Sequence, residues 1–363
     1  YQQPPMGVHL LELYDVQQAR VRITPYVRRT PLERSATLSR TLGTNVYLKY
    51  ELFQQTGSFK PRGAFNTMLA MNNQDRDAGV VGVSGGNFAQ GMAYAGQTLG
   101  VDTLVLMPET TPSNYVEATR GYGAAIEFEP TIDTLFAAAE ERAAAGRTLM
   151  HPFDHPDMMA GNGTVGLEIV EDVPDVTDVF VSVGGGGLMS GVLTAIKGLR
   201  PDTRMWAVET EGADVLSRSL AAGEQIRMQP TSRAKTLGSP YAAQTAIDLA
   251  VQLEDPPIVV SDEAAYRAMK TIMERTKVVP ELAASCTLAA AQTVADRFGP
   301  DDRVVLILCG GNVSVAYIAD MENAFGVATF PPPPGVVAAR SRGRWGCPTQ
   351  SRLLVGTSGF VRG

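Results

Sequence analysis

The stretch VFVSVGGGGLMSG, residues 179–191, decides the fold class of this chain. Its first five residues form a short, mostly apolar run that ends at glycines, which predicts a buried strand. Residues 188–199 continue with apolar side chains at helical spacing, which predicts a helix directly after the glycines. Four glycines between a strand and a helix expose backbone N–H groups at the helix N-terminus, where a phosphate binds well.

The same alternation of short apolar runs and helical patterns continues on both sides of this stretch. It predicts an α/β fold of two domains, each an open, mostly parallel sheet covered by helices. Predicted strands cover residues 46–50, 80–83, 103–107, 179–183, 205–208 and 304–308, and predicted helices cover 61–72, 88–99, 113–121, 131–145, 188–199, 262–276 and 282–298.

The chain divides into three parts by composition. The segment HPFDHPD at 151–157 holds two prolines and is interpreted as a crossing between domains. We therefore predict a small domain at 52–150 and a larger one formed by 1–51 together with 151–325. From residue 326 onward the sequence includes four consecutive prolines and scattered Arg, Gly and Ser, so 326–363 is predicted to be a disordered tail.

Bulk composition narrows the classes of function. The chain has 363 residues, is 44% hydrophobic and carries a net charge of −7. It has no long basic cluster, so we expect no nucleic-acid partner. It has no apolar run of about 18 residues and its first residues lack the pattern of a signal peptide, so we expect no membrane partner. Cys286, Cys309 and Cys347 form no disulfide framework, which favours the cytoplasm.

A second stretch, GSFKPRGA at 57–64, places Lys60 directly before a proline that suits the first turn of a helix. The positive end of the helix dipole and the apolar neighbour Phe59 both disfavour the charged ammonium. Lys60 is therefore predicted to have a lowered pKa. A lysine that loses its proton easily can form a Schiff base with an aldehyde.

Two further glycine turns follow predicted strands, SGGNFAQ at 84–90 and CGGN at 309–312. In open α/β sheets, ligands bind at the carboxyl ends of strands, so these turns and the tetraglycine turn are expected to meet. The backbone N–H groups of the turns can bind a phosphate and a carboxylate, and the amine of Lys60 can react with an aldehyde. Pyridoxal 5'-phosphate carries both an aldehyde and a phosphate, so it is the predicted cofactor.

A different cofactor stays open at this point. Gly185, Gly187 and Ser190 nearly match the G-x-G-x-x-G fingerprint, and Glu209 follows about 20 residues later. An NAD-dependent dehydrogenase is therefore a remote alternative, although it leaves Lys60 without a role.

Taken together, the motifs resemble those of the fold-type-II pyridoxal-phosphate enzymes, in the branch of serine and threonine dehydratases and serine racemases. That family has a fold like the β subunit of tryptophan synthase. The resemblance covers roughly residues 20–320 and rests on motifs in the family's order: GSFKPRGA, SGGNFAQG, AGNGT at 160–164, SVGGGGLMSG, AKTLG at 234–238, PELAAS at 280–285 and CGGN.

The resemblance implies roles for several residues of these motifs. Lys60 is the implied Schiff-base lysine and the acid/base, and Asn87 contacts the phenolic oxygen of the cofactor. Cys309 faces the pyridine nitrogen, and Glu281 lies close to the cofactor. The implied cofactor-binding set is Phe59, Lys60, Asn87, Gly184, Gly185, Gly186, Gly187, Leu188, Glu281 and Cys309, and the implied substrate-binding set is Ser84, Gly85, Gly86, Asn87 and Phe88.

The implied reaction is an α,β-elimination that converts threonine, serine or a related β-hydroxy amino acid to a 2-oxo acid and ammonia. A racemase or a β-replacement enzyme of the same fold is the main alternative. Racemases of this branch carry a serine where this chain has Gly85, which favours elimination. We expect the enzyme to be a homodimer.

Two more positions depart from the family pattern. Phe88 stands where histidine is usual, which predicts a preference for a bulkier or apolar side chain in the substrate. Some relatives bind a divalent cation near Glu209, through the carbonyl of Ala213 and an acid at the place of Val215. Since valine cannot replace that acid, we predict no metal, and Glu209 and Ala213 remain as candidates only.

Overall fold

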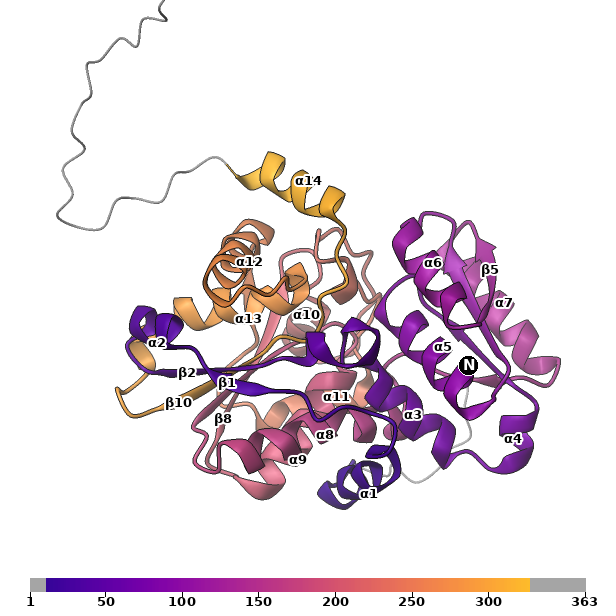
Figure 1. Ribbon diagram of the computed structural model, residues 1–363, viewed down its shortest axis with the longest axis horizontal. Helices are drawn as coiled ribbons and strands as arrows, with labels where there is room; N and C mark the ends of the chain where they lie inside the picture. Colours follow the sequence, from indigo (N-terminus) through magenta and orange to yellow (C-terminus); the bar gives the residue numbers. More distant parts are fainter. Residues whose placement is uncertain (1–10, 327–363) are drawn as a thin grey trace, which may run out of the picture. The chain divides into compact units, whose positions relative to one another are not determined.

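The computed structural model describes residues 11–326. For Ile132 and Asp133 within this range, it describes the backbone but not the side chains. The tail predicted at 326–363 lies outside the described residues apart from Gly326. The described part of the chain contains two sheets with helices packed on both faces (Figure 1).

The larger sheet has six strands in the order β1-β2-β10-β7-β8-β9. Its strands are parallel except for β1, which pairs antiparallel with β2. The strands are β1 (Leu32–Arg34), β2 (Asn45–Lys49), β7 (Asp178–Ser182), β8 (Arg204–Thr210), β9 (Ile258–Val260) and β10 (Arg303–Ile307).

The smaller sheet has four parallel strands in the order β5-β4-β3-β6. They are β3 (Val80–Val83), β4 (Thr103–Pro108), β5 (Ala125–Glu129) and β6 (Thr148–Leu149). All four come from the segment assigned to the small domain, and the other six lie outside it. The mostly parallel α/β class predicted from the sequence is confirmed, whereas the domain boundaries stay a prediction.

Side chains of β4 alternate between the two faces of the smaller sheet, as the period of a strand requires. Val105 and Met107 pack against side chains of α5 and α6, whereas Leu104 and Leu106 pack against α7.

On the larger sheet, α8 and α9 lie on one side and α12 and α13 on the other (Figure 1). The helices are α1 (Leu13–Ile23), α2 (Ala36–Leu42), α3 (Lys60–Ala70), α4 (Asn73–Asp77), α5 (Asn87–Leu99), α6 (Ser113–Gly121), α7 (Ile132–Ala144), α8 (Pro156–Asp172), α9 (Gly187–Leu199), α10 (Val215–Ala222), α11 (Gln244–Leu249), α12 (Asp262–Thr276), α13 (Leu282–Thr293) and α14 (Val315–Phe325).

Helix α8, with 17 residues, was not predicted from the sequence. Three glycines interrupt its pattern, and glycine normally weakens a helix. A Cβ at Gly161 would lie 2.4 Å from the carbonyl oxygen of Arg62, and one at Gly163 would lie 2.7 Å from that of Gly191. The glycines therefore let α8 pack backbone to backbone against α3 and α9.

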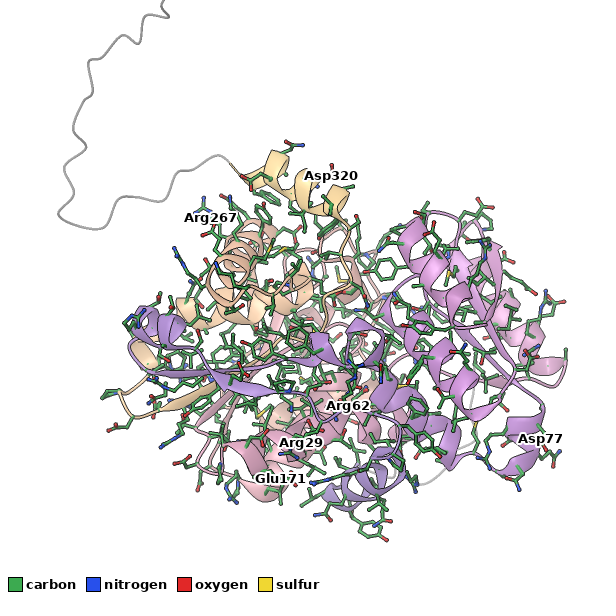
Figure 2. The ribbon with its side chains drawn as sticks, viewed as in Figure 1. Arg29, Arg62, Asp77, Glu171, Arg267 and Asp320 are labelled. Atoms are coloured by element: carbon green, nitrogen blue, oxygen red, sulfur yellow. The ribbon has the colours of Figure 1, made fainter. Side chains whose placement is uncertain are left out.

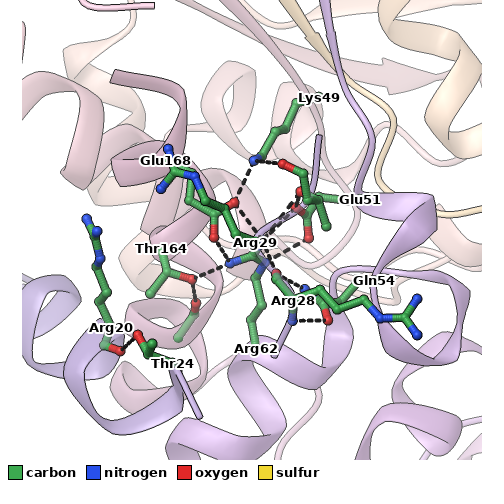
Figure 3. Close-up of polar contacts among 12 residues, drawn as sticks. Arg20, Thr24, Arg28, Arg29, Lys49, Glu51, Gln54, Arg62, Thr164 and Glu168 are labelled. Atoms are coloured by element: carbon green, nitrogen blue, oxygen red, sulfur yellow. Dashed lines mark hydrogen bonds and ion pairs between the residues drawn. The ribbon is translucent and has the colours of Figure 1, made fainter. Parts of the chain in front are cut away.

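A buried ionic cluster holds α3 in place (Figure 3). Arg62 Nε lies 2.8 Å from Glu51 Oε2, and Arg62 Nη1 lies 2.7 Å from Glu168 Oε1. Lys49 also pairs with Glu168 and donates a 2.8 Å hydrogen bond to the carbonyl of Thr30. Two cations thus face two carboxylates. Burial alone would raise the pKa of Glu168, but Arg62 and Lys49 outweigh it and lower that pKa.

Arg62 differs in its surroundings from the surface arginines (Figure 2). Its side chain is fully buried. The side chain of Arg29, which pairs with Glu171 and Asp172, is 46% exposed. A buried pair that loses one partner leaves an uncompensated charge in a medium of low dielectric, whereas an exposed pair is solvated and worth little.

We therefore expect Arg62→Met to lower the free energy of unfolding by about 3–5 kcal/mol, because Glu51 and Glu168 lose their shared cation. Arg29→Ala is the matched surface control and should cost less than about 1 kcal/mol. Urea unfolding followed by circular dichroism measures both. Equal losses for the two variants would contradict a structural role for the buried cluster.

Candidate active site

A cavity of about 680 Å³ lies at the carboxyl ends of β3, β7 and β10. All the residues predicted from the sequence to bind the cofactor or the substrate lie around this cavity. The cavity is lined by Phe59, Lys60, Ser84, Gly85, Gly86, Asn87, Phe88, Gly184, Gly185, Gly186, Gly187, Leu188, Glu281 and Cys309, among others. Glu209 and Ala213 do not line it.

Lys60 is the first residue of α3, and Pro61 follows in the first turn as expected. Its Nζ donates a 2.9 Å hydrogen bond to the carbonyl of Pro152 and lies 5.0 Å from the ring centroid of Phe59. Burial lowers the pKa of Lys60 to about 8, although Cys309 and Glu281 partly oppose the shift. The lysine thus supplies an amine that loses its proton near neutral pH.

The tetraglycine turn owes its composition to close packing. A Cβ at Gly185 would lie 2.3 Å from Phe153 Cγ, and one at Gly187 would lie 2.8 Å from the carbonyl oxygen of Phe153. Gly186 has a φ of +93° and is the N-cap of α9. As at the start of any helix, the first N–H groups of α9 have no acceptor within the helix. These amides are suited to an anion such as a phosphate.

Asn87 is held by two side chains from distant segments. Its Nδ2 donates to Glu281 Oε1 at 2.8 Å, and its Oδ1 accepts from Asn312 Nδ2 at 2.8 Å. Burial raises the pKa of Glu281 to about 7, while Asn87, Thr236 and Lys60 oppose the shift. Asn87 therefore keeps one orientation at the start of α5.

Cys309 lies two residues after the end of β10 and is a buried free thiol. Burial raises the pKa of Cys309 well above its ordinary value, so the thiol is neutral. Its carbonyl accepts a 3.1 Å hydrogen bond from Phe59 N, which ties the segment carrying Lys60 to the end of the larger sheet.

The turn from Ser84 to Phe88 leads from β3 into α5. Gly86 N donates to Ser84 Oγ at 3.1 Å, and Gly86 caps the helix. Phe88 lines the cavity, but only 2% of it is exposed and it packs with Phe65 and Met92 in the core. Its ring centroid lies 5.8 Å from Lys60 Nζ, so Phe88 joins the core to the cavity.

Several cavity residues escaped the sequence analysis because they lie between the recognised motifs. Pro152 and Phe153 belong to the segment interpreted as a domain crossing, and their contacts with Lys60 and the glycines carry no local signal. Nearby, burial lowers the pKa of His151 to about 4, and its Nδ1 accepts a 2.8 Å hydrogen bond from Asp154 N. Thr111, Tyr115, Pro240 and Tyr317 also line the cavity and lie outside the motifs, whereas Thr236 lies inside the AKTLG motif but received no predicted role.

Glu209, the candidate metal ligand, uses both carboxylate oxygens on helix α10. Oε1 accepts from Leu216 N and Oε2 from Ser217 N, each at 2.8 Å. Burial raises the pKa of Glu209 to about 7, although these bonds oppose the shift. The same bonds leave Glu209 unable to reach a ribose. Within residues 11–326, no group of three His, Cys, Asp or Glu side chains could hold a metal ion.

None of the helices within residues 11–326 is long and apolar enough to cross a membrane.

The residues present fit pyridoxal phosphate. The N-terminus of α9 offers amides for its phosphate, and the glycines of the preceding turn let its backbone pack closely against Phe153. Lys60 offers an amine for its aldehyde, and Cys309 offers a neutral thiol for its ring nitrogen.

The pKa of Lys60 predicts how cofactor-free protein takes up pyridoxal phosphate. Since only the free amine attacks an aldehyde, the initial rate should rise with pH through about 8 and then level off. An ordinary lysine, with a pKa of about 10.4, would be roughly 0.4% unprotonated at pH 8. Stopped-flow absorbance between pH 6 and pH 10 measures the rate. A rate that still climbs tenfold per pH unit at about pH 9.5 would indicate an ordinary lysine.

We expect Gly185→Ala to weaken the binding of pyridoxal phosphate, because its Cβ would lie 2.3 Å from Phe153. Overpacking of this kind costs about 1–3 kcal/mol, or about 5- to 150-fold in Kd. The matched control is Gly121→Ala at the end of α6, where a new Cβ meets nothing within 4 Å. Fluorescence titration gives both values of Kd, and unchanged binding in Gly185→Ala would argue against the cradle.

Comparisons with known proteins show the family to which the chain belongs. The chain is 34% identical over 330 residues to a catabolic L-threonine dehydratase of Staphylococcus aureus, covering 88% of this chain and 94% of that protein. The solved threonine deaminase from T.th. matches at 38% identity with a TM-score of 0.78, covering 84% of this chain and 99% of that one. Maize serine racemase matches at 31% identity with a TM-score of 0.81, covering 87% and 98%. The model of the family described as "Pyridoxal-phosphate dependent enzyme" matches residues 23–310, so this chain belongs to the pyridoxal-phosphate dependent enzymes.

Proposed function

We propose that this enzyme is an ammonia-lyase that converts threonine, serine or a related β-hydroxy amino acid to a 2-oxo acid and ammonia. The observation that carries the proposal is the Lys60 amine, with its pKa of about 8, facing the cavity that Gly187 and Asn87 also line. The dehydratase and deaminase among its relatives support this reaction. Pyridoxal phosphate, when bound, withdraws electrons from the substrate's Cα and so makes the α-proton acidic.

The residues of the chain bind the two reactants and move the proton. In this proposal Lys60 Nζ removes the proton from Cα, and the N–H groups at the start of α9 hold the cofactor phosphate. The N–H groups of the turn at 84–88 hold the substrate carboxylate. Asn87, fixed between Glu281 and Asn312, orients the cofactor ring.

The cavity also suggests which side chains are accepted. The residues that line it include the apolar side chains of Phe59, Pro112 and Phe136. A substrate that carries a methyl or phenyl group on Cβ buries apolar surface there and serine does not. Threonine or a bulkier relative is thus the favoured substrate.

We also propose that the enzyme works as a homodimer in the cytoplasm. Val21 and Val251 are 73% and 82% exposed and offer apolar contacts to a second copy. Both cysteines in the described part of the chain are free thiols, which suits a reducing compartment. Light scattering on the purified protein tests the dimer.

Purified holoenzyme incubated with L-threonine, L-serine and L-threo-phenylserine should release 2-oxo acid, with a higher kcat/KM for the two larger substrates. Lys60→Ala should lower turnover about 10²- to 10⁴-fold, since it removes the group that accepts the α-proton. A coupled dehydrogenase assay for the 2-oxo acid measures both effects. A clear optimum for serine would refute the side-chain preference, and no 2-oxo acid from any of the three would refute the elimination.

Racemisation of an amino acid is the second candidate, favoured by the similarity to maize serine racemase. Residue 85 has no side chain to move a proton, but the hydroxyl of Thr111 lies beside it. Chiral chromatography of the same reactions distinguishes the two, because a racemase forms D-serine faster than it forms 2-oxo acid.

A further inference from the structure

Gly85 and Thr111 share one space in the cavity wall. A Cβ built on Gly85 would lie 2.7 Å from Thr111 Oγ1 and 3.2 Å from Pro108 Cδ. Gly85 is not among the glycines with a positive φ, so its backbone does not require glycine. The side chain missing at residue 85 is replaced in space by the hydroxyl of residue 111.

This hydroxyl is buried and has no hydrogen-bond partner in the described part of the chain. A buried polar group without a partner costs about 1–3 kcal/mol, so a partner is expected when the site is filled. The backbone that carries Thr111 is well held. Thr111 N donates a 2.9 Å hydrogen bond to the carbonyl of Pro108, and Pro112 follows as the N-cap of α6.

The surroundings of Thr111 point to a carboxylate as that partner. Thr111 lines the same cavity as the turn at 84–88, next to the N-terminus of the 13-residue helix α5. Among the described lining residues the cationic side chains are Lys60 and Lys235. Lys235 is exposed, and Lys60 is the Schiff-base lysine of the proposed function. Apart from Lys235, a carboxylate in this turn therefore has neutral donors around it.

We propose that Thr111 is a substrate-binding residue whose hydroxyl donates a hydrogen bond to the α-carboxylate of the amino acid. The proposal rests on the proposed function only in that the site takes an amino acid. Gly85 is glycine because any side chain there would displace this hydroxyl. Thr111 and Gly85 thus act as a pair: one supplies the donor, and the other leaves the space.

The test uses the holoenzyme and two amines that differ only in the carboxylate. L-Alanine has the amine and the carboxylate but no β-hydroxyl, so elimination cannot consume it. Ethylamine is the same molecule without the carboxylate. The Kd of each comes from the change in cofactor absorbance on titration, for the wild type, Thr111→Val and Thr111→Ser.

Thr111→Val keeps the shape of the side chain and removes the hydroxyl. It should weaken L-alanine about 10- to 100-fold, as expected for a hydrogen bond to a charged group, and leave ethylamine unchanged. It should raise KM for L-threonine by a similar factor and change kcat by less than about 3-fold. Thr111→Ser retains the hydroxyl and should bind L-alanine within about 3-fold of the wild type.

A second route removes the same contact from the other side. Gly85→Ala should weaken L-alanine binding in the wild type, and its effect should be smaller in a Thr111→Ala background, where Pro108 Cδ still lies close to the new Cβ but the hydroxyl is gone. Equal binding of L-alanine by Thr111→Val and the wild type, or an equal loss for both amines, would overturn the proposal. Binding of L-alanine through Thr111 without any 2-oxo acid from threonine would refute the proposed function alone.

Discussion

The buried cluster around Arg62 is the interaction on which the site depends. It joins α3 to Glu51, just after β2, and to Glu168 on α8, so one side chain ties three distant segments together. Lys60 lies two residues before Arg62, in the first turn of the same helix. The position of the reactive amine is therefore set by charges that lie outside the cavity. Two cations and two carboxylates balance one another, which makes their burial tolerable.

Glycine contacts supply a second constraint. The glycines of α8 let that helix contact α3 and α9 backbone to backbone. In the turn before α9, Gly185 and Gly187 pack directly against Phe153. As a result, Phe153 packs against the glycine turn before α9, while the carbonyl of Pro152 accepts a hydrogen bond from Lys60 Nζ. The anion seat and the amine are thereby held by one short segment.

Burial also determines the charge state of the site. It lowers the pKa of Lys60 to about 8 and that of His151 to about 4, and it raises that of Glu281 to about 7. The thiol of Cys309 stays neutral. The cavity thus offers mainly neutral donors and one easily deprotonated amine.

The parallel α/β class, the lysine motif and the three glycine turns could be predicted from the amino-acid sequence, because strand period, proline and glycine act locally and strand ends of a parallel sheet meet at one edge. That α8 is a helix despite its glycines became evident from the fold, since contacts with Arg62 and Gly191 require those glycines. The fold also decided that Glu209 caps α10 and that Phe88 belongs to the core. The pairing of Gly85 with Thr111 joins residues 26 positions apart, and no local pattern encodes such a contact.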